Sequence, residues 1–309
     1  MNKKVIFEKG FGTIAPMMVD IEERLVKLEA VGVILRPGTP SLKHYYLDVK
    51  SIMAKYNIET LIDEASAEMI GMPDEGSRFV AMCKRADLLI SIGGDGTLIS
   101  MIRRGFRYQK PIVGINLGNL GFLTDIRSDE VENMVHRLLN HDYRIDQRML
   151  MQVDLKSGEK KQRYFTINDM VIRHKFSKMA HIKLYLDGNL ANSYYGDALI
   201  VSTPTGATGY NLSAGGPIVF PYAKNFVFTP ICPHSLTQRP LVLPVRFDVR
   251  LKVEEEGCML ILDGQTTLDF HPGDMLRIKM SPVGAKMLHR KERNFFHIIR
   301  EKLNWGDTR

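Results

Sequence analysis

The sequence predicts an N-terminal α/β domain followed by a C-terminal, mainly antiparallel β domain. Over residues 31–140, apolar runs such as residues 87–92 alternate with amphipathic segments, which is typical of a doubly wound parallel sheet covered by helices. After residue 145, apolar and polar residues alternate one by one, as in half-buried strands. The apolar stripe over residues 295–303 predicts a last helix, which we expect to pack back on the first domain.

A length of 309 residues suits two domains of ordinary size. We expect the first to comprise residues 1–145 together with 288–309, and the second to comprise residues 146–287. The hydrophobic content of 44% and charged content of 25% are typical of a soluble globular protein.

The charge and the cysteines narrow the class of protein further. A net charge of +7 suits a polyphosphate ligand or a nucleic acid. The sequence has no dense Lys/Arg run with interleaved aromatic residues, which argues against nucleic acid. We find no run long enough to span a membrane and no secretory signal, so no membrane partner is expected. The three cysteines are widely spaced and odd in number, which predicts reduced thiols in a cytoplasmic protein.

The first half reads as a series of strands and helices. Residues 18–30 carry an apolar helical stripe that would pack on its own domain or on a partner subunit. We expect strands at residues 31–35, 58–62, 87–92 and 111–115, and helices that begin after Ser41, near Phe79, at Leu98 and at Ser128, with Ser41 as an N-cap.

The second half reads as alternating strands. These are expected at residues 151–155, 182–186 and 249–253, and after residue 274. The pair Asp187-Gly188 follows the second of them and predicts a hairpin turn.

A glycine turn follows the apolar run at residues 87–92. Its phosphate-binding part would be Gly93, Gly94, Gly96 and Thr97, because glycines let backbone N–H groups approach a polyanion and the next helix contributes partial positive charge. Asp95 stands in the same turn, where a carboxylate repels phosphate unless it holds a metal or takes a proton from an attacking hydroxyl. A purely structural turn is the alternative.

Residues 116–125 follow the next strand and would form a second wall of the same crevice. Their glycine spacing differs from the G-x-G-x-x-G pattern, which is absent from the chain, and this argues against a hydride-transferring dehydrogenase. A tight loop with buried Leu120 and Phe122 is the alternative.

Asn168 and Asp169 stand inside an apolar run, residues 165–172, that we interpret as a strand. Short polar side chains are costly to bury without partners, and an amide beside a carboxylate can bind the edge of an adenine. A β-bulge with local hydrogen bonds is the alternative.

The stretch at residues 202–217 is rich in small hydroxyl residues and glycines after an apolar strand. Its many N–H and O–H donors suit a ligand, Tyr210 could stack on a base, and Asp197 could accept from a ribose hydroxyl. The alternatives are a surface loop and a solvated strand end. We interpret residues 231–240 as a rigid packing loop.

No histidine shows metal-ligand spacing, so no protein metal site is expected.

Together these motifs resemble the NAD kinase family, in the family's order from about residue 31 to the C-terminus. The matching stretches are Gly93–Thr97, Asn116–Thr124, Asn168-Asp169, Ser202–Gly206, Tyr210–Gly216, Pro233–Leu236 and Arg239-Pro240. The turn at residues 93–97 is shared with lipid kinases, whereas the loop at residues 202–206 with its tyrosine is more specific. One departure is Asp169, where the family more often has Glu.

The resemblance implies transfer of the γ-phosphoryl group of ATP to the 2′-hydroxyl of the adenosine ribose of NAD, giving NADP and ADP. It implies Asp95 as the general base, Mg²⁺ or another divalent cation that arrives with ATP, and a homo-oligomer, a dimer or tetramer. The nucleotide-binding residues that it implies are Asp95, Gly96, Asn168, Asp169, His181, Asp197, Thr208, Gly209, Tyr210, Asn211, Leu212, Ser213 and Gln265.

Two other functions remain open at the level of the sequence. A lipid kinase could use the same phosphate turn but has no need for Asn168-Asp169 or for the loop at residues 208–213. A non-catalytic sensor of the dinucleotide could share the fold, but it gains nothing from Asp95 beside phosphate.

Overall fold

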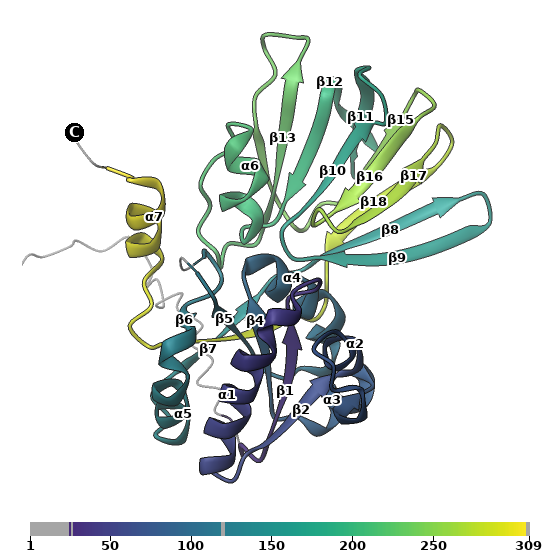
Figure 1. The fold of residues 1–309 in the computed structure, drawn as a ribbon. Helices are drawn as coiled ribbons and strands as arrows, with labels where there is room; N and C mark the ends of the chain where they lie inside the picture. The colour runs from purple at the N-terminus through teal and green to yellow at the C-terminus, as the bar shows by residue number, and fades with distance from the viewer. Residues whose placement is uncertain (1–24, 26, 119–120, 307–309) are drawn as a thin grey trace, which may run out of the picture.

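The structure is a computed structural model that describes Leu25, residues 27–118 and residues 121–306 (Figure 1). The helix expected over residues 18–30 lies mostly outside these residues. At its described end, residues 27–29 are not helical and Ala30 already begins the first strand.

The first domain is built on a mostly parallel sheet with the strand order β3-β2-β1-β4-β5-β19-β7, in which β6 also pairs with β5. Only β7 runs antiparallel, against β19. The strands are β1 (Ala30–Leu35), β2 (Glu59–Asp63), β3 (Gly76–Ser77), β4 (Leu88–Gly93), β5 (Ile112–Asn116), β6 (Ile126–Arg127), β7 (Arg144–Arg148) and β19 (Ala285–His289).

Helices cover both faces of this sheet. α1 (Lys43–Lys55) and α5 (Val131–Leu139) share one apolar core with alternate residues of β1 and β4, while α3 (Phe79–Arg85) and α4 (Asp95–Gly105) share another on the opposite face. All six residues of β4 are buried, which explains its continuous apolar sequence. This arrangement confirms the predicted doubly wound domain. Its shorter elements are α2 (Glu64–Met69), η1 (Pro40–Leu42), η2 (Pro73–Glu75), η3 (Phe106–Tyr108) and η4 (Ser128–Glu130).

One helix start differs from the prediction. Ser41 is not the N-cap of α1, because Pro40 begins the short helix η1 and the chain passes directly from Leu42 into α1 without a side-chain cap. Leu42 and, on α1, Tyr46, Val49 and Met53 are buried and form the inner face of this segment.

The second domain is an antiparallel sheet with the order β17-β16-β10-β12-β11-β15-β18-β8-β9, extended from β12 by β13 and β14. Alternate residues of its strands face one apolar core, as the sequence predicts. The strands are β8 (Met151–Ser157), β9 (Lys160–Thr166), β10 (Asp169–His174), β11 (Ala180–Leu186), β12 (Asn189–Ser202), β13 (Asn225–Pro233), β14 (Leu241–Pro244), β15 (Val249–Val253), β16 (Cys258–Leu262), β17 (Thr266–Phe270) and β18 (Met275–Met280).

The two sheets meet around α4, which lies at the junction in Figure 1. The chain returns to the first sheet through β19, and β7 pairs with it, so the boundaries predicted at residues 145 and 287 fall inside these two strands. The last helix, α7 (Phe295–Leu303), places the rings of Phe295 and Phe296 against Phe220 of the second domain. The residues between β19 and α7 make the polar contacts with the first domain.

The described residues contain no helix that is both long and apolar enough to cross a membrane. The three cysteines are free thiols, two of them buried and Cys232 exposed.

Candidate active site

The site begins at the turn between β4 and α4. β4 ends at Gly93, Gly94 is the N-cap residue, and Asp95 is the first residue of α4. The strand order reverses between β1 and β4, and ligands of open α/β sheets bind at the carboxyl ends of strands at such a switch point. The turn predicted from the sequence therefore lies at the expected ligand-binding edge of the sheet.

The Asp95 carboxylate accepts hydrogen bonds from three consecutive backbone N–H groups. Phe122 N lies 2.8 Å from Oδ2, Thr124 N lies 3.0 Å from Oδ1, and Leu123 N lies 3.3 Å from both oxygens. The approach is so close that a Cβ at Gly121 would collide with Asp95 Oδ1, which explains a glycine there. The two glycine-containing loops thus form one structure with Asp95 between them.

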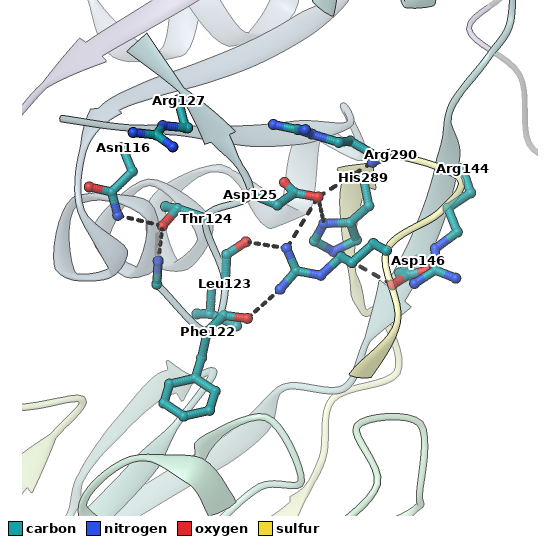
Figure 2. A network of polar contacts seen from close by, with 12 residues as sticks. Asn116, Phe122, Leu123, Thr124, Asp125, Arg127, Arg144, Asp146, His289 and Arg290 are labelled. Carbon is teal, nitrogen blue, oxygen red and sulfur yellow. Dashed lines mark hydrogen bonds and ion pairs between the residues drawn. The ribbon is translucent and has the colours of Figure 1, made fainter. Parts of the chain in front are cut away.

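Thr124 extends this contact into a short chain of hydrogen bonds. Its hydroxyl donates to Asp95 Oδ1 at 2.9 Å and accepts from Asn116 Nδ2 at 2.8 Å, as Figure 2 shows for Asn116 and Thr124. Gly121 N also donates to the hydroxyl, at 3.1 Å. Asn116 ends β5, so the neighbouring strand fixes the residue that holds the carboxylate.

A cavity of about 970 Å³ opens beside this turn, between the two domains. Gly94, Gly96 and Thr97 line it, and a Cβ at either glycine would meet open space. None of its described lining residues is acidic, and five are arginines: Arg36, Arg103, Arg104, Arg107 and Arg163. Guanidinium groups and free backbone N–H groups at a helix N-terminus are suited to a polyphosphate.

The second domain contributes Asn168 and Asp169, but not from inside one strand as predicted. β9 ends at Thr166 and β10 begins at Asp169, so Ile167 and Asn168 form a link between them. The backbone of this link forms hydrogen bonds with other loops and not with a neighbouring strand. Thr203 N donates to Asn168 O at 2.8 Å, and the Asp263 carboxylate accepts from the N–H groups of Ile167 and Asn168. The Asn168 side-chain oxygen is buried and has no hydrogen-bond partner among the residues that the structure describes.

The Asp263 carboxylate binds the backbone of this link just as the Asp95 carboxylate binds the backbone of residues 122–124. It accepts from Ile167 N, Asn168 N and Asp169 N at 2.8–3.0 Å. Burial and the neighbouring Asp263 raise the pKa of Asp169 to about 7. Burial also raises the pKa of Asp263, although its three N–H donors and Arg103 oppose the shift.

Arg103 and Gln265 connect the two domains across the cavity. Arg103, on α4, donates to Phe165 O at 3.2 Å and to Thr266 Oγ1 at 2.9 Å, and pairs with Asp263 at 3.4 Å. Gln265 donates to Gly96 O at 2.9 Å. The turn at residues 93–97 is therefore in direct contact with the second domain.

The loop at residues 202–217 lies next to Asn168. It contains η5 (Gly206–Thr208) and α6 (Tyr210–Ser213), and Gly206 packs directly on the Asn168 backbone. Tyr210 is 50% exposed, as a residue that stacks on a base would be. Asn211, in contrast, is buried. Its amide NH₂ donates to Ala207 O and Pro217 O, and its amide oxygen accepts from Thr229 Oγ1, so the side chain holds the loop together.

Sequence comparison assigns the two domains to a known family. A family model described as the ATP-NAD kinase N-terminal domain matches residues 31–143, and one for the ATP-NAD kinase C-terminal domain matches residues 167–290. The chain belongs to the NAD kinase family. It is 50% identical to the NAD kinase of Wolinella succinogenes over 286 residues, 92% of this chain and 98% of the relative, and 45% identical to that of Sulfurimonas denitrificans over 91% and 98%.

Solved structures of this family share the architecture. Yeast NADH kinase complexed with NADH matches with a TM-score of 0.81 and 25% identity, over 91% of this chain and 89% of that chain. An NAD kinase from Archaeoglobus fulgidus in complex with ATP has the same fold, with a TM-score of 0.68 and 22% identity over 89% and 98%.

Two residues that the NAD kinase resemblance singles out lie away from the turn. Asp197 precedes the end of β12 by five residues, which at about 3.3 Å per residue places it roughly 17 Å along the strand from Ser202. His181 lies opposite Tyr195 and bonds to Ser193 and Glu254. Within one chain, the structure does not bring these residues to Asp95.

Other residues around the candidate site are not predicted from the sequence. Arg103 stands eight residues after Asp95 on the same helix, and Asp263 stands two before Gln265, so both are close in sequence to predicted residues. Arg293 and His289 had no such signal, because only the fold brings them to the loop that follows β5.

Among the described residues, no group of three or more His, Cys, Asp or Glu could hold a metal ion. The cavity offers arginines and N–H groups, which suit phosphate oxygens. A divalent cation coordinated mainly by phosphates and water would be compatible with this set of donors.

Proposed function

We propose that this chain transfers the γ-phosphoryl group of ATP to the 2′-hydroxyl of the adenosine ribose of NAD, giving NADP and ADP. The observation that carries the proposal is the position of Asp95, which stands between two glycines of an arginine-lined cavity, where Gln265 of the second domain donates to Gly96 O. Membership of the NAD kinase family supports the same reaction.

The donor would bind in the cavity beside the turn. Gly94 and Gly96 would bring N–H groups and the N-terminus of α4 to the phosphates beside Thr97, and the arginines would neutralise their charge. Mg²⁺, or another divalent cation, would arrive with ATP and neutralise charge between the β- and γ-phosphates.

The acceptor would be bound by the second domain. Asn168, with its unpartnered oxygen, and the segment Thr208–Ser213 would hold the adenosine, with Tyr210 on the base. Asp169, Gly96 and Gln265 would complete this part of the site.

Asp95 would act as the general base. The 2′-oxygen forms a bond to the γ-phosphorus while the bond from that phosphorus to the β–γ bridging oxygen breaks, the hydroxyl proton passes to Asp95, and ADP leaves. The hydrogen bonds from residues 122–124 keep the carboxylate in one orientation for this transfer.

The purified full chain with ATP, Mg²⁺ and NAD tests the proposal. NADP is detected with an NADP-specific dehydrogenase, and radiolabel from [γ-³²P]ATP is followed into NAD and, in a parallel reaction, into diacylglycerol. NADP formation with label only in the dinucleotide supports the proposal. Label only in lipid would assign the chain to the lipid kinases, and binding of NAD without transfer would make it a sensor.

We also infer a cytoplasmic homo-oligomer, a dimer or tetramer. The free cysteines support the compartment. Exposed apolar side chains such as Tyr195 and Leu236, near His181 and Asp197 on the second sheet, support association of chains there. In an oligomer, His181 and Asp197 could reach a nucleotide held by another copy, and sedimentation equilibrium measures the number of copies.

A further inference from the structure

The loop that binds Asp95 is held from its other side by Arg293. The Arg293 guanidinium donates to Phe122 O and, at 3.5 Å, to Leu123 O, and it pairs with Asp125 at 3.1 Å. The Arg293 side chain is only 6% exposed. It stands just before α7, about 170 residues from the loop in sequence.

The same peptide groups bind both Asp95 and Arg293. The group between Phe122 and Leu123 presents its carbonyl to Arg293 and its N–H to Asp95, and the group between Leu123 and Thr124 does the same. In a planar trans peptide the C=O and N–H point in opposite directions, so fixing one end fixes the other. A charged donor on the carbonyl also polarises the peptide and strengthens its N–H as a donor.

A buried network keeps Arg293 in place. Asp125 accepts from His289 Nδ1 at 3.2 Å and from Arg290 N at 3.4 Å, and His289 lies between Asp125 and Asp146, as Figure 2 shows. Burial opposes ionisation of Asp125, but His289 and Arg293 hold the pKa of its carboxyl below the usual range. Burial lowers the pKa of His289, while Asp125 and Asp146 on either side of the ring oppose that shift. The charge of Asp125 therefore balances that of Arg293.

We propose that Arg293 is a positioning residue for phosphoryl transfer, which acts by holding the peptide groups of residues 122–124 in the orientation that fixes the Asp95 carboxylate. The inference rests on the proposed function, because it gives Arg293 a role only if Asp95 receives the proton. Arg293 does not line the cavity that would hold the phosphates. Its loss should therefore act on turnover and leave ATP binding intact.

The test compares R293M, R293K and the wild-type chain. We expect R293M to lower kcat by roughly 10- to 100-fold while the KM for ATP stays within about threefold, since small displacements of a reacting group have effects of this size. Lysine supplies a cation and N–H donors without the planar fork, so R293K should recover part of the loss. R85M is the matched control, because Arg85 pairs with Glu59 at the surface of the same domain and should keep wild-type kcat.

Hydrogen exchange of the full-length proteins supplies a second readout. The amides of Leu123 and Thr124 should exchange faster in R293K and R293M, with unchanged protection in β4 and β5. If R293M does not fold, R293K decides by itself: a lower kcat with faster exchange at these amides supports the proposal. Wild-type kcat in a folded Arg293 variant, or a change confined to KM, would overturn it.

The two levels of proposal fail in different ways. A wild-type chain that forms no NADP would refute the proposed function. A wild-type chain that forms NADP, beside Arg293 variants with undiminished kcat, would refute only the role of Arg293.

Discussion

Asp95 and Asp263 are bound by the protein in nearly the same way but lie in different surroundings. Each carboxylate accepts from three consecutive backbone N–H groups, those of residues 122–124 for Asp95 and those of residues 167–169 for Asp263. In both cases a loop after or between strands is fixed by a side chain that is distant in sequence.

The surroundings give the two carboxylates different tasks. The Asp263 side chain is fully buried and pairs with Arg103 across the domain junction, so it connects the second domain to α4. Asp95 is only partly buried, stands between glycines that face the arginine-lined cavity, and is the first residue of a helix. The same set of backbone donors thus supports a buried structural link in one place and a partly exposed carboxylate in the other.

The largest effect is expected from Asp95→Asn. The amide cannot take the proton of the attacking hydroxyl, so turnover should fall by at least ~10²-fold, the usual scale for loss of a general base. NAD binding should change little, but the melting temperature should fall, because the amide NH₂ replaces one of the two oxygens that accept from the loop. Steady-state kinetics, calorimetric NAD binding and thermal unfolding measure the three quantities. Unchanged turnover in this variant would refute the role of Asp95 as base.

Asp263→Asn should affect stability more than chemistry. It leaves Arg103 without its buried counter-charge and turns an NH₂ group toward backbone donors, which costs about 3–5 kcal/mol in comparable sites. Urea unfolding monitored by circular dichroism measures the loss. Asp248→Asn is the matched control, because Asp248 pairs with Arg250 and Arg277 at the surface of the same domain and should cost no more than ~1 kcal/mol. Equal losses in the two variants would contradict the structural role.

The contrast also explains which parts of the site the sequence could predict. The turn at residues 93–97 and the loop at residues 202–217 are local patterns, in which glycine and hydroxyl residues follow an apolar strand, so both could be recognised. An unusual polar residue in an apolar run predicts Asn168 as a site residue, and this stays a prediction, whereas the strand expected there is interrupted at residues 167–168.

The residues that hold these loops were not predictable in the same way. Asp263 and Arg293 act through backbone groups, and any sequence at residues 122–124 or 167–169 presents the same N–H and C=O groups. Only the fold, which brings residues about 95 or 170 positions apart into contact, identifies the pairs. His181 and Asp197 show a different difficulty. Each stands at a motif position, but a motif position does not tell whether the residues of one chain or of several chains form the site.

The smallest effect should come from Asp169→Asn, which tests the raised pKa beside Asp263. A carboxyl with a pKa of about 7 in the folded chain and about 4 when unfolded binds its proton more tightly in the native state. Its stabilising contribution is complete below pH ~4 and is lost as the pH rises through about 7. A shift of three pKa units sets an upper limit of about 4 kcal/mol on this contribution to the free energy of unfolding, and sharing of the proton with Asp263 should leave about 2 kcal/mol for Asp169.

The asparagine variant imitates the protonated form, so it should be more stable than the wild type at pH 8, with little difference at pH 5. Urea midpoints at both pH values measure this, with Asp74→Asn in the exposed helix η2 as control. A difference that is largest at pH 5 would show that Asp169 is ionised and stabilising in the native chain, as a surface carboxylate is.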